Sequence, residues 1–268
     1  MKVSLHNGKK GVGSARHNSR NYDYEKLSKH IDPEKVKDNL YLCVYPELKD
    51  NFPEAEKKFF EEYFSKTLDD RNEMCIRNNN KSRVKTMKQF MNLRQNIPQE
   101  TIIQIGDMHE HGSKKDLVKL YNELQRYSNE ISRGHCKTLN VAIHFDESTP
   151  HAHMRQLWIY DDENERGEKV FKIGREEALR RAGIERPFPD QPESRYNNRF
   201  MTYTRLMRER AEEFCIARGL DIDKNRYEKR PHLEKVDYIN HVINKEKEKV
   251  KEREMFKMKS DDNEDFIV

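Results

Sequence analysis

Apolar residues recur along the chain in short blocks that alternate between strand spacing and helix spacing. Compact or alternating apolar runs predict strands over residues 2–6, 40–45, 101–106, 137–146 and 151–160, with the run at 40–45 read as a buried strand. Longer periodic blocks predict helices from residue 51 to about 69 and over 84–93, 114–132, 198–218 and 231–259. This order predicts an α+β domain with a central antiparallel β-sheet flanked by α-helices.

The helix predicted over residues 114–132 has the clearest boundaries. Ser113 and Asp116 form an S-x-x-D pattern, in which the serine side chain caps the first backbone N–H groups of the helix. Gly134 follows the last periodic position and is a natural stop, because glycine adopts the left-handed conformation that ends many helices. A loop is predicted over 70–83, and 161–197 reads as a loop or insertion.

The length of 268 residues allows one large domain with an appendage. We place one large domain at residues 1–222 and a charged helical extension with an acidic tail at 223–268. The longest apolar run is far shorter than the ~18 residues of a membrane span, so we expect no membrane segment. The four cysteines are scattered, and no secretory signal is apparent, so we expect a cytoplasmic protein.

Three of the eleven histidines fall in one ten-residue window. Side chains alternate between the two faces of a strand, so His144 projects away from Leu139, Val141, Ile143 and Phe145, which are predicted to share the other face. The turn residues 146–150 can join the two strands in an antiparallel hairpin, with His151 and His153 on one face of the second strand. Cross-strand neighbours lie about 5 Å apart, so the three imidazoles converge.

Three converging imidazole nitrogens with open coordination positions suit a catalytic divalent cation. Such a cation can bind phosphate oxygens and act as a Lewis acid. Glu147 lies in the same turn. It could be a fourth ligand, a residue that orients a ligand, or a general base.

A second motif, His17-Asn-Ser-Arg20, follows a basic, glycine-rich stretch. Its combination with the later H-x-D-E-x-T-P-H-x-H motif, residues 144–153, resembles the Mob/Pre plasmid mobilisation proteins, the MobV-type relaxases. The H-x-H pair at His151 and His153 is also similar to that of the broader HUH endonuclease superfamily. The resemblance covers residues 1–160 in order and spacing.

The resemblance implies a relaxase-like fold and a metal-dependent enzyme that nicks one DNA strand at an origin of transfer. It implies that the enzyme stays covalently attached to the 5′-phosphate through His17. His144, His151 and His153 match the metal ligands, and the metal would be Mn²⁺ or Mg²⁺. The partner would be single-stranded or supercoiled origin-of-transfer DNA, for plasmid mobilisation or recombination.

The net charge of +4 is small for a nucleic-acid enzyme, but residues 2–20 hold five Lys or Arg and no acid. This local field predicts salt-sensitive DNA binding limited to one face. Lys9, Lys10, Arg16 and Arg20 would contact the DNA backbone. Arg20 would clamp a phosphate bidentately.

Three alternatives stay open at this point. Tyr22 and Tyr24 follow the first motif closely, and a tyrosine there could replace His17 as the nucleophile. A replication-initiation or transposition nuclease of the HUH type would carry its tyrosine on a later helix, where Tyr203 lies. A non-catalytic DNA-binding module is the third. The thin apolar stripe of 231–259 could also pair two chains into a homodimer.

Overall fold

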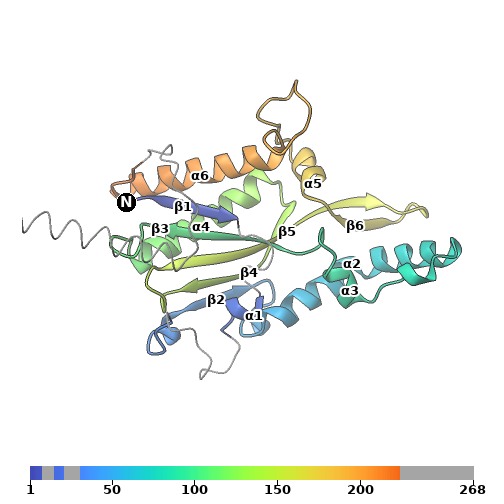
Figure 1. The fold of residues 1–268 in the computed structure, drawn as a ribbon, viewed down its shortest axis with the longest axis horizontal. Coiled ribbons are helices and arrows are strands. Elements are labelled where there is room, and N and C mark those ends of the chain that lie inside the picture. Colours follow the sequence, from blue (N-terminus) through green and yellow to red (C-terminus); the bar gives the residue numbers. More distant parts are fainter. Residues whose placement is uncertain (8–14, 21–30, 224–268) are drawn as a thin grey trace, which may run out of the picture. The chain divides into compact units, whose positions relative to one another are not determined.

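The protein is described from a computed structural model, which covers residues 1–7, 15–20 and 31–223. An antiparallel sheet with the strand order β1-β3-β5-β4-β2 lies at its centre, and β6 pairs with the distal half of β5 (Figure 1). The strands are β1 (Val3–Asn7), β2 (Leu40–Cys43), β3 (Gln99–Ile105), β4 (Cys136–His144), β5 (His151–Glu163) and β6 (Lys169–Ile173). The predicted α+β class with an antiparallel sheet is confirmed.

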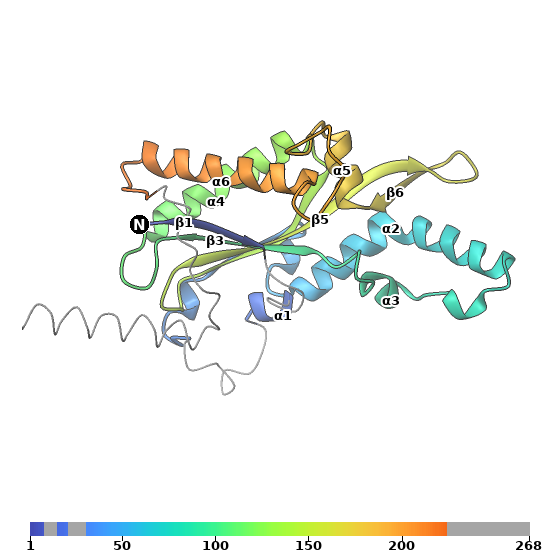
Figure 2. The ribbon, with the colours of Figure 1, turned by 45° about the horizontal axis from the view of Figure 1, so that its top comes forward.

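Helices cover both faces of this sheet (Figures 1 and 2). They are α1 (Ala15–Asn18), α2 (Phe52–Arg77), α3 (Met87–Met91), α4 (Lys114–Ile131), α5 (Arg175–Arg181) and α6 (Arg199–Ala217). Buried residues of α4 and α6 form one hydrophobic core with the first face of the sheet. Buried phenylalanines of α2 and α3 form a second core on the opposite face.

The alternation of side chains along β5 decides which face carries the histidines. Met154 and Trp158 belong to the core under α4 and α6, whereas Leu157 and Ile159 belong to the core under α2. His151 and His153 have the odd parity of the second pair, so they share the α2 face of the sheet.

A β-bulge in β4 corrects one predicted face. The register with β5 shifts between Thr138 and Asn140, so Leu139 is an extra residue without a partner in the ladder. Leu139 therefore packs in the α2 core, while Val141 and Ile143 pack under α4. The prediction that these residues share one face was wrong for Leu139, because a bulge breaks the period of two.

The predicted helix starts are confirmed by their caps. The side chain of Asn51 accepts a hydrogen bond from the Glu54 N–H at the start of α2, and that of Ser113 accepts one from the Asp116 N–H at the start of α4. At the other end, Gly134 has a φ of 77°, as its predicted stop position requires.

Two predicted irregular segments contain regular structure. Residues 70–77 continue α2, and 161–197 contains the end of β5, strand β6 and helix α5. The two corrections have one cause, because the distal part of α2 packs against β6. The hydroxyl of Thr67 donates a hydrogen bond to the Phe171 carbonyl. Tertiary contacts of this kind are absent from local sequence patterns.

Strand β2 is not buried as predicted. It pairs only with β4 at the edge of the sheet, and the side chains of Leu40 and Leu42 are 42% and 48% exposed. Among the described residues, no helix has the length and apolar character needed to cross a membrane. The predicted helix at 231–259 and the acidic tail lie outside the described residues, so the domain boundary at 222/223 stays a prediction.

Candidate functional site

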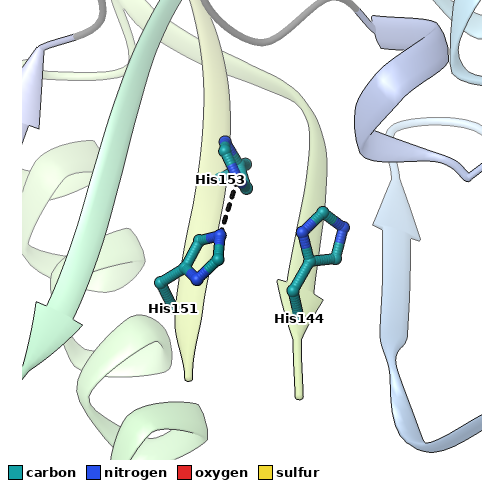
Figure 3. A group of neighbouring side chains, drawn as sticks. All are labelled: His144, His151 and His153. Carbon is teal, nitrogen blue, oxygen red and sulfur yellow. Dashed lines mark hydrogen bonds between the residues drawn. The ribbon is translucent and has the colours of Figure 1, made fainter. Parts of the chain in front are cut away.

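The three hairpin histidines lie together at the point where β4 ends and β5 begins (Figure 3). His144 and His151 are directly opposite each other in the ladder, and His153 follows His151 on the same face. The ring centroids lie 5.4 Å apart for His144 and His151, 5.0 Å for His144 and His153, and 4.8 Å for His151 and His153. One nitrogen from each ring lies within 4.8 Å of the other two.

Hydrogen bonds indicate which nitrogen of each ring faces away from the cluster. Nδ1 of His151 lies 2.8 Å from the Thr149 carbonyl, and Nδ1 of His153 contacts the Glu100 carboxylate. Nε2 of His144 lies 3.0 Å from the Asn18 carbonyl. These oxygens only accept, so the nitrogens facing them donate. The other nitrogen of each ring then faces the cluster, namely Nε2 of His151, Nε2 of His153 and Nδ1 of His144. The last of these lies 3.1 Å from the donor Nη2 of Arg20.

The site keeps two of these imidazoles neutral. Burial, reinforced by the charge of Arg20, lowers the pKa of His144 to about 2. Burial, reinforced by His153, lowers the pKa of His151 to about 4. The Nε2 atoms of His151 and His153 are only 2.9 Å apart, at hydrogen-bond distance (Figure 3). Such converging nitrogen donors fit a divalent cation.

His17 lies beside this cluster although it is remote in sequence. Its ring centroid is 6.4 Å from that of His144 and 6.3 Å from that of His153. Burial and then the charge of Arg20 lower the pKa of His17, which favours the neutral ring. Helix α1, a single turn, thus holds the H-N-S-R motif against the hairpin motif.

Arg20 ties the first motif to the hairpin turn. Its side chain is buried, and its Nε and Nη2 atoms donate to the two oxygens of Asp146 at 3.0 and 2.9 Å. Nη2 also lies 2.9 Å from Glu147 Oε1 and 3.1 Å from Nδ1 of His144. The guanidinium thus has carboxylate partners inside the protein. The predicted phosphate clamp at Arg20 stays a prediction, and the observed contacts favour a positioning role.

Glu147 lies at the border of the cluster. Its Oε1 is 4.0 Å from Nε2 of His151. Together with His144 and Asp146 it forms a second group of side chains that could hold a metal ion. The three roles considered for Glu147, as ligand, orienting residue or base, are all compatible with this position.

Sequence reasoning missed Glu100, which lies on β3 behind the histidines and is 4% exposed. Its carboxylate accepts hydrogen bonds from Nδ1 of His153 and, at 3.0 Å, from the Asn18 amide. It therefore connects the hairpin, β3 and the H-N-S-R motif. A carboxylate directly before the predicted strand at 101–106 was the available signal, because charges that become buried need partners.

The remaining predicted residues are distributed differently. Arg16 is exposed on α1. Tyr203 is buried on the opposite face of the sheet, where its hydroxyl lies 2.7 Å from that of Ser128. The sheet itself therefore separates Tyr203 from the histidines and argues against it as a nucleophile. Four candidates lie outside the described residues: Lys9, Lys10, Tyr22 and Tyr24.

An antiparallel sheet with an H-x-H pair on a central strand and a third histidine on its neighbour is the arrangement expected of a relaxase domain. Among solved structures, the chain is similar to Mn-bound crystal structures of the MobM relaxase domain (MOBV; Mob_Pre) bound to plasmid pMV158 oriT DNA. The structure at pH 6.8 has a TM-score of 0.52 at 14% identity and covers 90% of this chain and 99% of that one. The structure at pH 4.6 has a TM-score of 0.50 at 14% identity, with 90% and 100% covered.

Neither a protein-family model nor a curated protein sequence matches the chain. The similarity is therefore one of fold, and it shows that this chain has the relaxase-domain fold. The expectation of that fold from two short motifs is confirmed.

Proposed function

We propose that this protein is a metal-dependent DNA relaxase. It nicks one strand at the origin of transfer of a plasmid or mobile element and becomes linked to the 5′-phosphate through His17. We call His144, His151 and His153 the metal-type histidines. The observation that carries the proposal is the position of the His17 ring, whose lowered pKa favours the neutral form, about 6 Å from the rings of His144 and His153. The relaxase-domain fold supports the same reading.

His144, His151 and His153 are the residues that would hold the metal ion. When bound, a divalent cation offsets the charge on the non-bridging oxygens of the scissile phosphate. Imidazole ligands favour a first-row transition metal over Mg²⁺, and they do not by themselves single out Mn²⁺. The Mn-bound state of the MobM structures is in line with this choice.

Arg20 prepares His17 for attack. Its Nη1 lies 3.3 Å from Nε2 of His17, and a guanidinium can only donate, so Nε2 carries the lone pair and Nδ1 the proton. Nε2 gives up the Arg20 hydrogen bond as it attacks the phosphorus, an N–P bond forms, and the bond from phosphorus to the 3′-oxygen breaks. The ring loses its Nδ1 proton and the leaving 3′-oxygen takes up one proton, so the step balances. We assign the transfer of this proton to Glu147, whose charge acts on His17.

A nicking assay tests the proposal. Supercoiled DNA carrying the origin of transfer, incubated with the protein and Mn²⁺, is expected to become relaxed and to carry bound protein on denaturing electrophoresis. EDTA should abolish both products, because the histidine cluster then lacks its cation. Metal-dependent binding without any nicked strand would contradict the enzyme and support the non-catalytic DNA-binding module.

Glu100→Gln is expected to weaken Mn²⁺ binding by roughly 10- to 100-fold, because the carboxylate orients the ring of His153 and raises its basicity. Isothermal titration calorimetry with Mn²⁺ measures the change. Glu56→Gln is the matched control, since Glu56 is also a buried carboxylate on this face but contacts Arg155 and Asn140. Equal losses in the two variants would show that Glu100 has no specific role at the metal site.

A further inference from the structure

A second basic region lies between α2 and β3, far from the N-terminal motif. Residues 77–98 contain three arginines and three lysines and no aspartate or glutamate. The six cations are Arg77, Lys81, Arg83, Lys85, Lys88 and Arg94. Exposed asparagines at 78–80 and 92 add neutral hydrogen-bonding groups. We call residues 77–94 the basic arm.

Most charges of the basic arm are uncompensated within the described part of the chain. Lys81, Arg83, Lys88 and Arg94 are exposed, and they form no ion pair there. Arg77, the first cation of the arm, pairs with Glu165. The neighbouring Lys66 and Arg166 pair with Glu168 and Glu73. Four unpaired cations close together in a segment without any carboxylate favour an external anionic partner.

The basic arm is held in place by packing and hydrogen bonds. Phe90 is buried in the α2 core, where Met87 and Leu93 also pack. Thr86 and Gln89 form a capping box at the start of α3. The Asn72 side chain bonds both the N–H and the carbonyl of Lys85 at 2.9 Å. The cations are therefore presented on a preorganised scaffold, which lowers the entropic cost of binding.

The basic arm lies on the same face of the sheet as the histidines. The core that holds α3 includes Leu157 and Ile159, which follow His151 and His153 on the same side of β5. Figure 2 shows α3 against α2 on this side. Ile159 lies six positions beyond His153 along β5, which corresponds to about 20 Å of strand. A DNA duplex covers that distance in about six base pairs.

We infer that the basic arm is a second DNA-contact surface that binds the phosphodiester backbone, without reading sequence, on the face of the sheet that carries His144, His151 and His153. The inference rests on the proposed function, because it extends the DNA path from the histidine cluster across the α2 face of the sheet. It assigns a role to a segment that sequence reasoning treated only as loop and short helix.

The test is the salt dependence of DNA binding by the full chain. In the Arg83→Gln/Lys88→Gln variant, the slope of log Kd against log salt concentration is expected to fall by about 1.5, because each phosphate contact contributes about 0.7–0.9. Adding Lys81→Gln and Arg94→Gln should raise the loss to about 3. The probes are a fluorescent single strand of about 30 nucleotides and the matching duplex, and the probe that responds identifies the form of DNA bound.

The matched control is Lys115→Gln/Lys119→Gln, which removes two exposed lysines of α4 on the other face of the sheet. Its slope should equal that of the unaltered protein. Unchanged slopes in the arm variants on both probes would overturn the inference. So would a loss of binding to phosphatidylserine vesicles with DNA binding intact, which would assign the arm to a membrane surface.

The nicking assay on the unaltered protein distinguishes a wrong assignment of the basic arm from a wrong proposed function. If the protein nicks DNA while the arm variants keep its salt slope, only the basic arm is wrongly assigned. If the unaltered protein neither nicks nor binds DNA, the proposed function fails with it.

Discussion

Replacing His17 by alanine is expected to abolish the covalent protein–DNA adduct and to lower nicking by at least about 10⁴-fold, as removal of an enzyme's nucleophile generally does. Alanine removes the nitrogen whose lone pair Arg20 fixes by donating to Nε2. The three metal-type histidines keep their own partners in this variant, because their hydrogen bonds run to Thr149, Glu100 and Asn18. Mn²⁺ binding should therefore persist while the chemistry is lost.

The measurement is adduct formation on origin DNA with Mn²⁺, followed by denaturing electrophoresis, with Mn²⁺ titration in parallel. Tyr22→Phe and Tyr24→Phe are the controls, and both should still form the adduct. The bond to the wild-type protein should be labile to acid, as a phosphoramidate is and a phosphotyrosine is not. An adduct that survives in the His17 variant and is lost in one of the tyrosine variants would assign the nucleophile to that tyrosine.

Local sequence patterns were sufficient to predict the arrangement of the histidine hairpin. The period of two along each strand and the turn residues at 146–150 are enough to bring His144, His151 and His153 to one face. Both are local properties, and the structure has the ladder they predict. The relaxase-domain fold followed from the same residues together with His17 and Arg20, because their order and spacing resemble a family.

What the sequence did not reveal depends on contacts between distant segments. The carboxylates that receive Arg20 and His153 come from Asp146 and Glu100, which are 126 and 53 positions away from their partners. The bulge at Leu139 and the pairing of β6 with β5 are likewise decided by packing, not by local periodicity. Strand β2 was misjudged for the same reason, since an apolar run does not say whether a strand lies at the edge.

Removal of the Arg20 guanidinium by Arg20→Ala is expected to lower the free energy of unfolding by about 3–5 kcal/mol, as breaking a buried ion pair from one side generally does. The side chains of Arg20 and Asp146 are only 3% and 0% exposed, so water cannot replace the lost partner. Alanine keeps a Cβ at φ 51°, so the backbone conformation at this position is equally unfavourable in both proteins. The measured loss therefore reports the ion pairs and not a relief of backbone strain.

Urea unfolding in the presence of EDTA measures this loss without a contribution from bound metal. Arg218→Ala is the matched control, because Arg218 also donates Nε and Nη2 to one carboxylate, that of Asp116, but at the surface, with side chains 30% and 18% exposed. It should cost at most about 1 kcal/mol. Equal losses for the two arginines would contradict the assignment of Arg20 as the residue that fixes the H-N-S-R motif to the hairpin. A large loss confined to Arg20→Ala would instead show that the contacts of Arg20 with the hairpin stabilise the fold. The same guanidinium would then serve stability and chemistry together, because it pairs with Asp146 and also donates to Nε2 of His17.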